Sequence, residues 1–64
     1  MFQVGDLVII LKVGDQDQHL MKRLWGKMGI IIEKVNTSSS PNIWKVLVED
    51  TYYHLHKLDL QKLN

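Results

Sequence analysis

The histidines are the side chains in this sequence best suited to bind a metal ion. His54 and His56 are two positions apart in a stretch that predicts a strand, so both imidazoles face the same side of a sheet. Two imidazoles can bind a divalent metal, but a stable site needs at least a third ligand. That ligand would have to come from His19, Asp50 or Asp59, because the chain contains no cysteine. We therefore predict no metal site and interpret both histidines as exposed or hydrogen-bonded strand residues.

The nucleophilic side chains fall in segments typical of turns. Ser38 to Ser40 lie in a polar loop, and Thr51 follows two acidic residues. No histidine or carboxylate is placed by its spacing to activate any of these hydroxyl groups. Gly26-Lys27 lacks the upstream glycine of a phosphate-binding P-loop. The sequence therefore predicts a protein that is not an enzyme and uses no cofactor.

Positive charge gathers around an aromatic ring between residues 22 and 27. Lys22, Arg23 and Lys27 flank Trp25, and this stretch contains no acidic residue. Cations that contact phosphates, beside a ring on which bases stack, are a common way to hold single-stranded RNA or DNA. The alternative is that Trp25 closes one end of a small core while the cations stay solvated. The formal net charge of only +1 favours this alternative.

Length and composition restrict the class of protein. A chain of 64 residues without cysteine predicts a single domain, 1–64, that depends on a compact apolar core or on a partner for stability. Residues 1–13 lack the features of a signal peptide, and no segment is long and apolar enough to span a bilayer. We expect a soluble cytoplasmic protein without a membrane partner.

The segment from Trp25 to Val35 organises the rest of the chain. Gly26 and Gly29 precede three consecutive isoleucines, whose β-branched side chains favour a strand. We expect both glycines to supply the positive φ of a sharp turn into this strand, which spans residues 28–36. A bulge is expected near Glu33.

Several short strands with turn signals between them predict a small all-β barrel. We expect the remaining strands over residues 7–13, 43–49, 52–56 and 61–63, with a single helical turn at 57–60. Residues 37–42 form the clearest loop, and 49–51 form a tight turn. Residues 14–25 are compatible with a short helix, but a long loop is favoured because so short a helix is marginal in water.

Only one face of each strand of a small barrel points inward, yet two of the expected strands are apolar on both faces. In the first strand, Leu7, Ile9 and Leu11 share one face, and Val8 and Ile10 share the other. In the second strand, Ile30 and Ile32 lie on one face and Ile31 lies on the other. An apolar set that faces outward marks a partner surface. Alternatively, Leu20, Met21 and Leu24 of the long loop fold over that set. Both interpretations stay open.

The first half of the chain resembles the SH3-like barrel and its KOW motif. The motifs concerned are Gly5-Asp6-x-Val8 and, after a long loop, Gly26-x-x-Gly29-x-Ile31. Residues 44–50 and 56–60 are similar to short SH3-like proteins of tailed phages, so the resemblance covers nearly the whole chain. It implies five strands, a one-turn 3₁₀ helix before the last strand, and a binding or adaptor role. KOW domains that bind RNA usually carry a more basic loop beside the glycine, where this chain has Lys27 alone.

These observations lead to a non-enzymatic SH3-like adaptor, encoded by a phage, that docks on a host or virion protein or associates with itself in the host cytoplasm. The residues expected to contact the partner are Leu20, Met21, Trp25, Trp44, Tyr52, Ile9 and Ile32. The alternative is a KOW-type binder of nucleic acid or of the transcription machinery that uses Lys22, Arg23, Trp25 and Lys27. A further alternative is a small accessory subunit of a photosynthetic or redox complex, a class that also uses this barrel.

Overall fold

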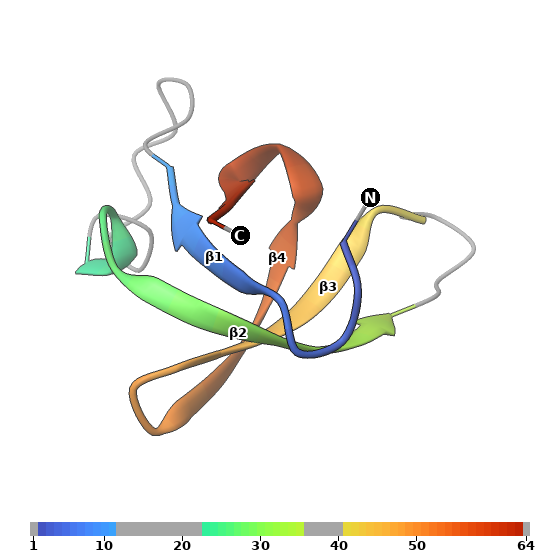
Figure 1. Ribbon diagram of the computed structural model, residues 1–64, viewed down its shortest axis with the longest axis horizontal. Coiled ribbons are helices and arrows are strands. Elements are labelled where there is room, and N and C mark those ends of the chain that lie inside the picture. Colours follow the sequence, from blue (N-terminus) through green and yellow to red (C-terminus); the bar gives the residue numbers. More distant parts are fainter. Residues whose placement is uncertain (1, 12–22, 36–40, 64) are drawn as a thin grey trace.

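The computed structural model describes residues 2–11, 23–35 and 41–63. The elements are β1 (Leu7–Ile10), β2 (Met28–Val35), β3 (Ile43–Val48), β4 (Thr51–His56), the 3₁₀ turn η1 (Lys57–Asp59) and β5 (Leu60–Lys62). All five strands belong to one antiparallel sheet in the order β4-β3-β2-β1-β5. The sheet is strongly curved (Figure 1). The predicted all-β, barrel-like architecture, with its 3₁₀ turn before the last strand, is confirmed. In the described ranges, no helix is long and apolar enough to cross a membrane.

The element boundaries differ from the expected ones by a few residues. β1 ends at Ile10 instead of continuing to Val13. The next residue, Leu11, leaves the ladder and donates its N–H to the carbonyl of Asp59 at 2.8 Å. The choice between loop and helix for residues 14–25 lies mostly outside the described residues. At its end, Arg23 and Leu24 have helical backbone conformation, and a turn follows.

The two glycines before the isoleucine run have different roles. Gly26 has a φ of +81°, which confirms the expected turn. Gly29 is not among the residues with positive φ, so that expectation is wrong for Gly29. A Cβ atom at Gly29 would lie 2.6 Å from Cγ1 of Val46 and 3.1 Å from the carbonyl oxygen of Leu47. Gly29 is therefore required because β3 packs closely against β2 at this position.

A β-bulge interrupts the pairing of β2 with β3, as the sequence predicted near Glu33. Ile31 pairs with Val46, but Glu33 pairs with Lys45, so one strand contributes an extra residue between these pairs. A bulge bends the strand and increases its local twist. β2 can therefore run along the whole curved sheet as its longest strand.

In the part of the chain that the structure describes, the buried core contains only apolar side chains. Strand alternation places Val8, Ile10 and Ile31 inside and turns Leu7 and Ile30 outward, each 39% exposed, which settles the choice of face that the sequence left open. Among the described residues, the buried side chains are Val8, Ile10, Leu24, Ile31, Trp44, Val46, Val48, Leu55 and Leu60.

Candidate functional site

A row of apolar side chains crosses four strands on the outer face of the sheet. The strand registers place Leu7 opposite Ile30, Ile30 opposite Leu47, and Leu47 opposite Tyr52. Directly opposed side chains in antiparallel strands are about 5 Å apart, so these four form a continuous row. Tyr52 at its end is 57% exposed. An apolar set that faces outward, one of the two interpretations that the sequence left open, is therefore present on β1 and β2, and it extends to β3 and β4.

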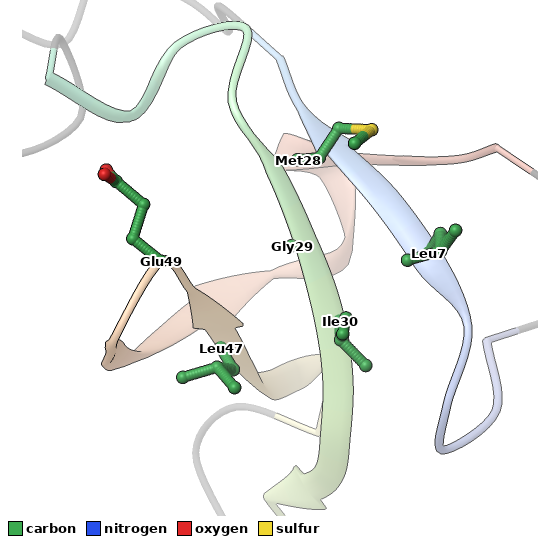
Figure 2. Close-up of a pocket in the computed structure, with 6 residues that line it drawn as sticks. All are labelled: Leu7, Met28, Gly29, Ile30, Leu47 and Glu49. Atoms are coloured by element: carbon green, nitrogen blue, oxygen red, sulfur yellow. The ribbon is translucent and has the colours of Figure 1, made fainter.

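The row borders a shallow groove of about 190 Å³. We call the six residues that line it the outer groove: Leu7, Met28, Gly29, Ile30, Leu47 and Glu49. Figure 2 shows these residues on β1, on β2, on β3 and in the turn that follows β3. Met28 is 61% exposed, and of the six residues Gly29 alone is buried, beneath the groove. The groove thus lies on the outer face of the sheet.

The carboxylate of Glu49 provides the polar end of the outer groove. Glu49 is the first residue of the two-residue turn between β3 and β4 and has a φ of +60°. Glycine normally occupies this position, and another residue there costs about 1–3 kcal/mol. The carboxylate accepts a hydrogen bond from Nζ of Lys27 at 2.6 Å. Because both side chains are largely exposed, this ion pair stabilises the fold by at most about 1 kcal/mol.

A second hollow, of about 330 Å³, lies where the end of β2, the start of β3 and η1 meet. We call the residues that line it the aromatic pocket: Phe2, Lys34, Asn42, Trp44 and Lys57. The rings of Phe2 and Trp44 meet edge to face, with centroids 5.8 Å apart. Nζ of Lys34 lies 5.6 Å from the centroid of Trp44. The backbone N–H of Lys57 donates to the carbonyl of Asn42 at 2.9 Å and so fixes η1 beside the start of β3.

The residues expected to contact a protein partner are dispersed. Leu20 and Met21 lie outside the described residues. Tyr52 is exposed at the end of the apolar row, and Ile9 and Ile32 are half-buried.

The two tryptophans expected in the interface pack inward. Trp44 is only 8% exposed and belongs to the core, because alternation along β3 turns it inward with Val46 and Val48. Burial leaves Trp44 too little surface to act as the anchor of a protein interface, although part of it lines the aromatic pocket. Trp25 is half-buried and packs against the same core.

The basic residues between 22 and 27 are only partly described. Lys22 lies outside the described residues, Arg23 is exposed, and Lys27 is paired with Glu49. Sequence reasoning missed this pair because its members are 22 positions apart and meet only through the sheet. It also missed the aromatic pocket, whose residues come from separate segments and form no local motif.

The two histidines of β4 differ in environment. His54 is exposed, whereas Nδ1 of His56 accepts the N–H of Leu58 at 3.1 Å and caps η1. The hydrogen-bonded role that the sequence suggested is therefore observed for His56. In the described part of the chain, no group of three His, Cys, Asp or Glu side chains could hold a metal ion.

Comparison of the chain with protein-family models, curated proteins and solved structures finds no match in any of the three. The function is therefore inferred from the geometry of the groove and the pocket.

Proposed function

We propose that the protein is a small, non-enzymatic binding module that docks on a protein partner through the outer groove and Tyr52. The observation that carries this proposal is the apolar row from Leu7 to Tyr52, which crosses four strands outside the core. A small protein that exposes a contiguous apolar surface gains free energy when a partner covers it.

The surroundings of the row resemble the anatomy of a protein interface. Tyr52 supplies a large exposed aromatic side chain, the kind that dominates interface energies. Nζ of Lys45 lies 4.8 Å from its ring centroid and helps to hold the ring in place. The ion pairs of Lys27 with Glu49, and of Lys45 with Glu33 at 3.9 Å, supply polar groups around an apolar centre.

An SH3-like classification and an origin in a tailed phage belong to the same proposal. The sequence resemblance supports both, and the strand order with a 3₁₀ turn before β5 supports the first. A phage origin would place the partner in the host cytoplasm or in the virion. The KOW-type alternative has weaker support, because Glu49 matches the charge of Lys27 and Trp25 packs against the core.

The test compares two double variants with equal changes in composition and charge. Ile30→Lys/Leu47→Lys places two cations in the outer groove, whereas Leu58→Lys/Leu63→Lys changes two exposed leucines outside it. Each chain is immobilised and exposed to lysate of the native host, and self-association is followed by sedimentation. We expect the wild type and the leucine control to bind the same partner. The groove variant should bind that partner with an affinity lower by about tenfold or more.

Circular dichroism and thermal melting verify that both variants stay folded. Equal capture by the two variants would contradict docking through the groove. A wild-type chain that captures no protein and stays monomeric at high concentration would refute the proposal as a whole.

A further inference from the structure

The lysines of the described residues divide into two groups by their partners. Three lysines lie close to carboxylates: Lys27 to Glu49 at 2.6 Å, Lys45 to Glu33 at 3.9 Å, and Lys62 to Asp6 at 3.5 Å. Lys34 and Lys57 have no carboxylate partner within the described ranges. Both of these lysines line the aromatic pocket.

The aromatic pocket therefore combines unbalanced positive charge with an aromatic wall. Lys34 at the end of β2 and Lys57 in η1 border the same hollow, into which Phe2 and Trp44 also face. Asn42 adds a side-chain amide that can both donate and accept hydrogen bonds. None of the described residues that line the pocket is acidic. An anion is thus the complementary ligand.

The aromatic rings favour an anion that carries a base over a simple inorganic anion. A simple inorganic anion would need the two ammonium groups alone, whereas a base also gains contact with an aromatic ring. The volume of about 330 Å³ reaches the size of typical small-ligand pockets. Phe2 is half-buried and Trp44 is 8% exposed, so Phe2 supplies most of the aromatic surface of the pocket.

We propose that the aromatic pocket binds one nucleotide, either free or as a unit of a single strand. Lys34 and Lys57 contact the phosphate, and the base lies against Phe2 and the exposed part of Trp44. The amide of Asn42 is placed to bond to the edge of the base. This site shares no residue with the outer groove or with the basic stretch at residues 22–27, so it stands independently of the proposed docking function.

The proposal is tested by NMR titration of the ¹⁵N-labelled full chain with three probes: adenosine monophosphate, inorganic phosphate and a short oligothymidylate. We expect the nucleotide to shift the amides of Lys34 and Asn42 and the indole N–H of Trp44. Inorganic phosphate should bind about tenfold more weakly, because it gains no contact with the rings. Tighter binding of the oligonucleotide than of the mononucleotide identifies a strand as the ligand, and the reverse identifies the free nucleotide.

Two double variants with the same change in net charge separate a local site from general attraction. Lys34→Glu/Lys57→Glu should lower nucleotide affinity about tenfold or more, whereas Lys27→Glu/Lys62→Glu should leave it nearly unchanged. Equal losses of nucleotide affinity in the two variants would show that the nucleotide is attracted only by the net positive charge of the protein. That result would overturn the proposal. Phosphate that binds as tightly as the nucleotide, or no shift at about 10 mM nucleotide, would overturn it as well.

Discussion

The outer groove and the aromatic pocket differ in their relation to the hydrophobic core. No residue of the groove belongs to the buried cluster, whereas Trp44 of the pocket does. The exposed side chains of the groove, such as Leu7, Met28 and Ile30, can therefore be exchanged with little effect on packing. The aromatic wall of the pocket is also a wall of the core, so its binding role is altered separately from stability through Lys34, Asn42 and Lys57, which lie outside the core.

The two hollows also differ in charge balance. The lysine beside the groove, Lys27, has Glu49 as its partner, while the lysines of the pocket have no carboxylate partner within the described ranges. A neutral apolar groove suits a hydrophobic protein surface, and an unbalanced cationic pocket suits an anion. One small sheet thus presents two chemically distinct surfaces.

The contrast between the two hollows is tested most strongly at Trp44. Trp44→Ala should lower the free energy of unfolding by about 3–5 kcal/mol, because it leaves a cavity in the core. Ile30→Ala, in the groove, should lower it by about 1 kcal/mol or less, because Ile30 is partly exposed. Urea denaturation followed by circular dichroism measures both values. Similar losses in the two variants would contradict the separation of the groove from the core.

The next largest effect is expected at Gly29. Gly29→Ala should lower the free energy of unfolding by about 1–3 kcal/mol, because the new Cβ meets Val46 and the backbone of Leu47. Chemical denaturation of Gly29→Ala beside Ile30→Ala measures this loss. An unchanged unfolding midpoint in Gly29→Ala would show that β3 moves away at little cost. In that case the groove would be more adaptable than its geometry indicates.

The smallest effect, and one of opposite sign, is expected at Glu49. Glu49→Gly should raise the free energy of unfolding by about 1 kcal/mol, because glycine relieves the strain of the positive φ. The lost ion pair with Lys27 offsets only part of this gain, since both side chains are exposed. Thermal melting provides the measurement, and Asp50→Gly is the matched control because Asp50 has no positive φ. A lower stability for Glu49→Gly would mean that the ion pair outweighs the strain.

Local sequence patterns predicted most of the fold. Alternation along the chain separated Val8 and Ile10 from Leu7, and the residues before and after Glu49-Asp50 predicted the β3–β4 hairpin. These features depend on neighbouring residues, which a single sequence displays directly. The presence of apolar residues on both faces of β1 and β2 was recognised for the same reason.

Features that depend on the sheet register could not be predicted. The role of Gly29 depends on the path of β3, and the pair of Lys27 with Glu49 depends on a contact across 22 positions. The aromatic pocket is a stronger example, because Phe2, Trp44 and Lys57 meet only when the sheet has curved. Tryptophan was expected in an interface because of its residue type, but alternation along β3 buried Trp44.

The position of β5 has a consequence for the order in which the sheet assembles. β5 pairs with β1, placing Ile9 opposite Gln61, whereas β3 and β4 are joined by a two-residue turn. Bringing distant segments together costs more loop entropy than closing a hairpin. We therefore expect the β3–β4 hairpin to form early in the transition state and the β1–β5 pairing to form last. Substitutions in the hairpin should then slow folding, and substitutions in β5 should mainly accelerate unfolding.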